Sequence, residues 1–285
     1  MSPPRSSLPH RSRLQWVSEM RVLGIDLAWA TNKKSGVSNE TGVVAVESDG
    51  TVVDAGWTRG LAETLDWIAA NAGPDTFAMI DAPLVVTNAV GQRACERQTG
   101  QRYGRWKVSA NSTNLNSRNL GGQKLRILLE EGGWIYNAGW SGPPAAGRHF
   151  SECYPYTALV GAAELGYDDE RPVYKRKPKA MARSAFRPHR AAVCDDLLAR
   201  LDRLVLADPS LRLRSHPVTA ALIDERSPIV DVAYKHREDL VDAAICAWTG
   251  LLWLRYGWER CQVLGDVENA PDATIIAPAR SSQRR

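Results

Sequence analysis

Arg21-Val-Leu-Gly-Ile-Asp26 is the stretch from which the fold of this chain can be read. Its apolar run has the length of a buried strand, and it ends in a carboxylate. Thr76-Phe-Ala-Met-Ile-Asp81 repeats this arrangement further along the chain. An isolated buried carboxylate is costly unless it is protonated or paired, so two strands that each end in an aspartate indicate a functional site.

A third acidic segment lies at the start of the most apolar helical stretch, Asp239-Leu-Val-Asp242-Ala-Ala-Ile-Cys-Ala-Trp248. Asp239 and Asp242 are three residues apart and therefore share one face of the helix. His236 extends the same spacing by one step. Acids in the first turn of a helix also favour the helix dipole, which is the alternative role for Asp239. Because converging carboxylates repel one another, the whole set predicts a divalent-metal site.

The composition is that of an ordinary globular protein, since 44% of the 285 residues are hydrophobic and 24% are charged. No apolar run reaches the ~18 residues that a membrane span needs, so we expect no membrane partner. The five cysteines show no Cys-x-x-Cys spacing, which favours a reduced, cytoplasmic setting over a disulfide framework. Nothing in the sequence reports the oligomeric state.

One domain is expected over residues 20–279, with insertions at about 85–120 and 167–188. Residues 1–19 are rich in Ser, Pro and Arg and have no apolar core, so they predict a disordered extension rather than a secretory signal. Met20 directly precedes the first strand and is an alternative start of the chain. Residues 280–285 form a basic tail.

Positive charge is concentrated in two internal segments. Residues 93–126 contain eight Lys or Arg against one acid, and residues 171–190 contain another eight against none. The net charge of +4 arises at the two ends of the chain, so a basic field over the whole body is excluded. The two segments predict either solvated loops or two basic arms that bind a polyanion such as nucleic acid.

The order of the elements predicts an α/β fold. A strand at 21–28 is followed by a hairpin at 43–57, a helix near 61–69, a strand at 76–81, a helix near 122–131 and a fifth strand at 149–154. Short connections make the first three strands antiparallel, and helical crossovers make the last two parallel to the first. This is a ribonuclease H-like mixed five-stranded sheet flanked by helices. Asp26 and Asp81 should meet at one sheet edge, and Glu152 should reach the same rim.

Four short motifs resemble those of the family called domain of unknown function 429, over roughly residues 20–260. They are Gly24-Ile-Asp26-Leu-Ala-Trp29, Ile80-Asp81-Ala-Pro83, Glu152-Cys-Tyr-Pro155 and His236-Arg-Glu-Asp239-Leu-Val-Asp242-Ala-Ala. The family is described as predicted nucleases of the ribonuclease H superfamily. The paired acids on the last helix also resemble those of RuvC-type junction resolvases, at this site alone.

The resemblance implies hydrolysis of a phosphodiester with two Mg²⁺ or Mn²⁺ ions ~4 Å apart. Asp26 would bridge the ions, Asp81 and Asp242 would each hold one, and Asp239 would be a further ligand or would support one. Glu152 would be an outer ligand or the partner of a basic residue; the alternative is an ordinary acid at a strand end that faces solvent. Oxygen ligands without a Cys/His cluster suit these hard cations rather than zinc.

Two other functions stay open. One is a hydrolase or phosphotransferase of a small phosphorylated substrate, which the absence of a glycine-rich loop after Asp26 disfavours. The other is a non-enzymatic protein that binds nucleic acid or another ligand on the same fold.

Overall fold

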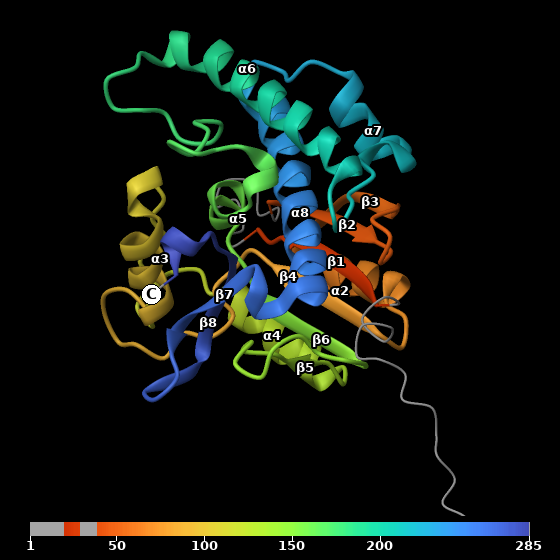
Figure 1. The fold of residues 1–285 in the computed structure, drawn as a ribbon, viewed down its shortest axis with the longest axis vertical. Coiled ribbons are helices and arrows are strands. Elements are labelled where there is room, and N and C mark those ends of the chain that lie inside the picture. Colours follow the sequence, from red (N-terminus) through yellow and green to blue (C-terminus); the bar gives the residue numbers. More distant parts are fainter. Residues whose placement is uncertain (1–19, 29–38, 285) are drawn as a thin grey trace, which may run out of the picture.

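A mixed six-stranded sheet forms the centre of the protein (Figure 1). The computed structural model describes residues 20–28 and 39–284. The strands are β1 (Arg21–Asp26), β2 (Glu40–Val46), β3 (Val52–Arg59), β4 (Thr76–Ile80), β5 (Ile135–Tyr136) and β6 (Arg148–Glu152), in the order β3-β2-β1-β4-β6-β5. β1, β2 and β3 pair antiparallel, whereas β4, β6 and β5 run parallel to β1. The strand directions agree with the prediction.

The predicted count of five strands was wrong, because β5 adds a sixth at the edge. β5 has two residues, and so short a strand leaves no alternating pattern in a sequence. A separate antiparallel hairpin follows the last helix, formed by β7 (Cys261–Asp266) and β8 (Ala270–Pro278). The sequence predicts two short strands, near 261–264 and 273–277, but not their pairing.

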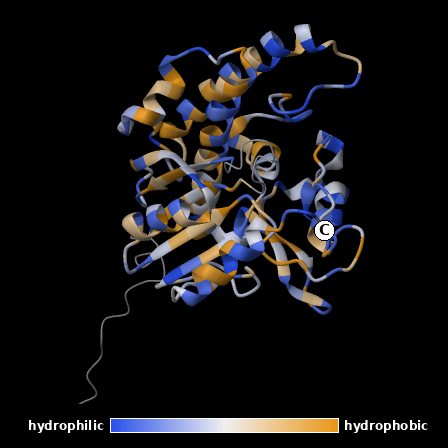
Figure 2. Cartoon of the chain, turned by 180° about the vertical axis from the view of Figure 1, so that it is seen from behind, coloured by the Kyte–Doolittle hydropathy of each residue, from blue (hydrophilic) through white to orange (hydrophobic). Residues whose placement is uncertain are grey.

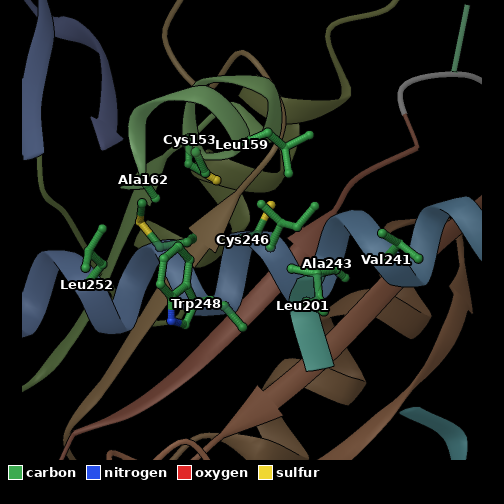
Figure 3. Close-up of a cluster of buried hydrophobic side chains, with 14 of the residues drawn as sticks. Cys153, Leu159, Ala162, Leu201, Val241, Ala243, Cys246, Trp248 and Leu252 are labelled. Carbon is green, nitrogen blue, oxygen red and sulfur yellow. The ribbon is translucent and has the colours of Figure 1, made fainter. Parts of the chain in front are cut away.

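Helices cover both faces of the main sheet. They are α2 (Gly60–Asn71), α3 (Ala94–Tyr103), α4 (Gly121–Glu131), α5 (Pro155–Gly161), α6 (Arg183–Asp202), α7 (Pro217–Asp224) and α8 (Asp231–Tyr256). α2 and α4 pack on one face, and α5, α6 and α8 contribute to the apolar cluster on the other. In that cluster Cys246 and Trp248 of α8 lie beside Cys153 and Leu159 (Figure 3).

Two glycines allow α8 to lie directly on the sheet. A Cβ atom at Gly24 of β1 would stand 2.0 Å from the carbonyl oxygen of Ala243, and one at Gly42 of β2 would stand 2.1 Å from that of Asp239. No side chain fits in either place, so the helix backbone rests on the strand backbone. This contact fixes the position of the acidic turn of α8 over the end of β1.

Both basic insertions contain more regular structure than the sequence predicted. The first includes α3, and α6 begins at Arg183, inside the second, with Pro188 within the helix rather than at its start. Three arginines in the first turns of α6 bind Asp231, and this anchorage extends the helix toward its amino terminus. Figure 2 shows hydrophobic and hydrophilic bands along α6, as expected for a helix with one buried face.

The described part of the predicted basic tail, residues 280–284, packs against the rest of the protein. Gln283 is buried, and the Arg284 guanidinium donates to the carbonyl oxygens of Trp258 and Ala279. The predicted extension at 1–19 lies outside the described residues, as does the loop after Ala28. None of the described helices is long and apolar enough to cross a membrane.

Candidate metal centre

Asp26, Asp81 and Asp242 meet at one edge of the sheet. The Asp81 amide donates to the Ile25 carbonyl oxygen at 2.8 Å, which aligns the ends of β1 and β4 as predicted. One carboxylate oxygen from each of the three aspartates lies within 4.8 Å of the others. Asp242 is fully buried, and Asp26 and Asp81 are partly buried. The sequence predicted this convergence of two strand ends and one helix.

The alternation of side chains along the strands explains which acids converge. Val22, Gly24 and Asp26 point to the face that α8 covers, and Met79 and Asp81 do the same from β4. α8 begins at Asp231, earlier than predicted, so Asp239 and Asp242 lie in its third and fourth turns. The alternative role of Asp239, as a first-turn acid that favours the helix dipole, is therefore excluded.

Burial and mutual repulsion raise the pKa values of these carboxyl groups. Burial is the largest cause that raises the pKa of Asp26 well above its ordinary value, and the nearby Asp242 raises it further. The pKa of Asp81 is raised by burial first and by Asp26 second. Burial raises the pKa of Asp239 to about 6. A cation placed among these groups would favour their ionised forms.

The spacing of the three aspartates suits a hard divalent cation. Mg²⁺ holds its oxygen ligands at roughly 2.0–2.1 Å, so oxygens on opposite sides of the ion lie about 4 Å apart. Three carboxylate oxygens within 4.8 Å of one another need only a small contraction to reach that distance. The buried aspartates can therefore hold a metal ion.

Tyr174 and Lys175 complete the surroundings of Asp242, and the sequence analysis did not single out either of them. The Tyr174 hydroxyl donates to Oδ1 of Asp242 at 2.6 Å, and the Lys175 ammonium pairs with Oδ2. Lys175 is largely buried, with 18% of its side chain exposed. Its pKa is raised well above the ordinary value because Asp242, Asp26 and Asp81 together outweigh the effect of burial.

Asp239 stands beside the three-aspartate group and is bound by Lys235. The Lys235 ammonium pairs with Oδ1 of Asp239 and donates to Oε1 of Glu238 at 3.1 Å. The charge of Asp239 also raises the pKa of Asp26, and both residues line the same cavity. The structure thus brings Asp239 beside the three-aspartate group.

Glu152 reaches the rim but points away from the three aspartates. Glu152 is paired with Ile80 in the sheet, so its side chain points to the same face as Ile80 and to the opposite face from Asp81. Its two carboxylate oxygens accept from the Arg93 guanidinium at 2.6 and 2.8 Å, and the Leu84 amide donates to one of them at 2.9 Å. Of the two roles predicted for Glu152, the observed contacts are those of a partner to a basic residue.

His236 also lies outside the group. Its ring stacks on Trp57 with the ring centroids 3.6 Å apart, and its Nδ1 atom is 2.7 Å from Oε2 of Glu40. Trp57 Nε1 donates to the His236 carbonyl oxygen at 2.7 Å. These contacts join the start of α8 to β2 and β3.

A cavity of about 1140 Å³ opens onto the centre. Asp26, Asp81 and Asp239 line its acidic side, and Arg176 and Arg190 from the second basic segment line it elsewhere. The cavity is large enough for a ligand of several hundred Å³ that touches both regions.

The basic segments are only partly free to bind a polyanion. Arg93, in the first segment, is buried between Glu96 and Glu152. In the second segment, Lys175 neutralises Asp242, while the guanidinium groups of three arginines surround the single carboxylate of Asp231. The three are Arg183, Arg187 and Arg190, and they leave an excess of positive charge beside the cavity.

Fold and site together define an α/β protein with a buried group of three aspartates that can hold a metal ion. The chain belongs to the family described as protein of unknown function (DUF429), whose model matches residues 24–269. The motifs quoted from the sequence had indicated this family. Comparisons with curated proteins and with solved structures found no match.

Proposed function

We propose that this protein is a Mg²⁺- or Mn²⁺-dependent nuclease of the ribonuclease H-like class. The observation that carries the proposal is the convergence of Asp26, Asp81 and Asp242, three buried carboxylates at a sheet edge that faces a large cavity. Three antiparallel strands followed by parallel strands, in the order β3-β2-β1-β4-β6, support the ribonuclease H-like assignment. A bound ion would polarise a phosphodiester and activate water.

The residues of this chain supply the remaining parts of the site. Asp26, Asp81 and Asp242 would hold the ion, and Asp239 would hold the Lys235 ammonium beside them. Arg176 and Arg190 line the same cavity and favour a substrate with phosphates on both sides of the cleaved bond. A polyanionic strand could reach both the aspartates and the two arginines, whereas a small monophosphate could reach only one of these regions.

Metal binding is the first test because it needs no knowledge of the substrate. Mn²⁺ titrated calorimetrically into the wild-type protein should give saturable binding that Asp26→Asn and Asp242→Asn abolish. Asp66→Asn is the matched control, since Asp66 is exposed on α2, which packs on the opposite face of the sheet from α8. Circular dichroism of each variant verifies that the loss of binding does not come from unfolding.

Cleavage is the second test. Labelled single-stranded and double-stranded DNA and RNA are incubated with Mg²⁺, Mn²⁺ or EDTA, and the products are separated on a gel. Metal-dependent cleavage lost in Asp26→Asn and retained in Asp66→Asn supports the proposal. A folded protein that binds no Mn²⁺, either alone or with oligonucleotide, refutes it; metal-independent retention of the oligonucleotide would indicate a binding protein instead.

A further inference from the structure

Lys175 places a positive charge inside the centre, at a carboxylate that also belongs to the metal-holding group. Its ammonium pairs with Oδ2 of Asp242, whose other oxygen accepts from the Tyr174 hydroxyl. Both oxygens of Asp242 are therefore engaged by neighbours on one short piece of chain. A metal ion bound only to Asp242 would have to displace one of them.

The Lys175 ammonium is held in place from several sides. It lies 5.5 Å from the ring centroid of Tyr156 on α5 and 5.6 Å from that of Tyr174. The Tyr174 carbonyl oxygen accepts from the Tyr234 hydroxyl of α8 at 2.7 Å, which fixes the backbone next to the lysine. This coil between α5 and α6 lies beside the amino-terminal half of α8 (Figure 1).

From these contacts we propose that Lys175 is a fixed cation that takes the place of a second metal ion at Asp242, so that each chain binds one divalent ion. The inference rests on the proposed function, and it replaces the pair of ions that the family resemblance implies. The ammonium occupies Oδ2, so a second divalent ion bound to that oxygen would stand within a few ångströms of it and would be repelled strongly. The single ion is then held by Asp26, Asp81 and the Oδ1 atom of Asp242, which accepts from a neutral hydroxyl and keeps a second lone pair.

The stoichiometry of metal binding tests the inference. Calorimetric titration with Mn²⁺ should give one ion per wild-type chain and two per chain of Lys175→Met, which keeps an unbranched side chain one atom shorter and removes its charge. Tyr174→Phe removes a hydrogen bond to Asp242 without changing the charge and should stay at one ion. Lys179→Met is the control for a lysine lost from the same segment, because Lys179 is exposed.

Two measurements on the wild type do not depend on a variant that folds. The electron paramagnetic resonance spectrum of the Mn²⁺-loaded protein should be that of an isolated ion, without the splitting of a coupled pair. Lys175 should stay protected from acetylation when Mn²⁺ is added, whereas Lys179 should be labelled with and without the metal.

The outcomes separate this inference from the proposed function. Two ions per wild-type chain, a coupled Mn²⁺ spectrum, or Lys175 labelling that rises with Mn²⁺ would overturn the inference and leave the nuclease proposal intact. A Lys175→Met protein that still binds one ion would also overturn it. No Mn²⁺ binding by the wild type would overturn the proposed function itself.

Discussion

Replacing Glu152 with Gln should destabilise the protein without removing its metal site. The side chains of Glu152 and Arg93 are each 3% exposed, and they form a bidentate ion pair. Removal of one partner from a buried pair costs about 3–5 kcal/mol, because the other charge stays buried without compensation. Glu96 remains beside Arg93 at 2.9 Å, so we expect the lower end, about 3 kcal/mol.

The assay is urea unfolding followed by tryptophan fluorescence, in the presence of EDTA. A loss of about 3 kcal/mol in the free energy of unfolding corresponds to a melting temperature lower by roughly 6–12 °C in a protein of this size. Glu164→Gln is the matched control, since the Glu164–Arg260 pair has side chains 22% and 25% exposed. A partly exposed pair of this kind contributes about 1 kcal/mol or less.

Metal binding decides between the two roles predicted for Glu152. If Glu152→Gln unfolds at a lower urea concentration but binds Mn²⁺ with the wild-type affinity once folded, Glu152 is the structural partner of Arg93. A variant with unchanged stability and lost Mn²⁺ binding would refute the reasoning, because it would make Glu152 a ligand of the ion.

Three further predictions concern the site and its surroundings. Asp26→Asn should raise the stability of the metal-free protein at pH 8 more than at pH 5. The pKa of Asp26 is higher in the folded than in the unfolded protein, so the wild type loses stability as the pH rises from about 4 through the pKa of the folded state. Urea unfolding in EDTA at both pH values measures the difference. Gly42→Ala should lower the free energy of unfolding by about 1–3 kcal/mol and weaken Mn²⁺ binding, because the added Cβ atom would collide with the backbone of α8. Gly56→Ala, where a Cβ atom has open space, should be nearly neutral in both urea unfolding and Mn²⁺ titration. Arg176→Ala should weaken oligonucleotide binding, because Arg176 lines the cavity, and should reduce the salt dependence of the binding constant by about one unit of slope in a filter-binding titration. Arg226→Ala, at an exposed arginine that does not line the cavity, should change neither quantity.

The convergence of Asp26 and Asp81 could be predicted because it depends on strand order and direction alone. Each residue ends an apolar run, and a parallel pair of strands brings such ends to one edge. The burial of Asp242 could be predicted from its apolar neighbours. They surround it on the helix, so the carboxylate has no solvent-exposed face to occupy. The start of α8 was placed too late, since residues 231–235 carry no apolar periodicity.

The position of Glu152 relative to the centre could not be predicted without the register of β6 against β4. A shift of one residue moves a side chain to the other face of a sheet, and no residue pattern within β6 itself fixes its register against β4. Lys175 was missed for a different reason, because it lies in coil without periodicity. The one available signal was Pro172-Val-Tyr174, a short apolar interruption in a basic run, and both Pro172 and Tyr174 are buried in the structure.

The packing of α8 on β1 makes the stability of this protein depend on whether a metal ion occupies the group of three aspartates. Because α8 packs directly on β1 at Gly24, moving the helix away to reduce the repulsion between Asp26 and Asp242 would lose packing contacts in the core. In the metal-free protein, Lys175 therefore neutralises part of the negative charge of Asp242, and the repulsion among the remaining aspartates is not compensated. An ion that binds only the folded state contributes about 2.7 kcal/mol at a concentration one hundred times its Kd. The melting temperature should consequently rise with Mn²⁺ concentration in the wild type and not in Asp242→Asn, which makes thermal unfolding a direct report on occupancy of the centre.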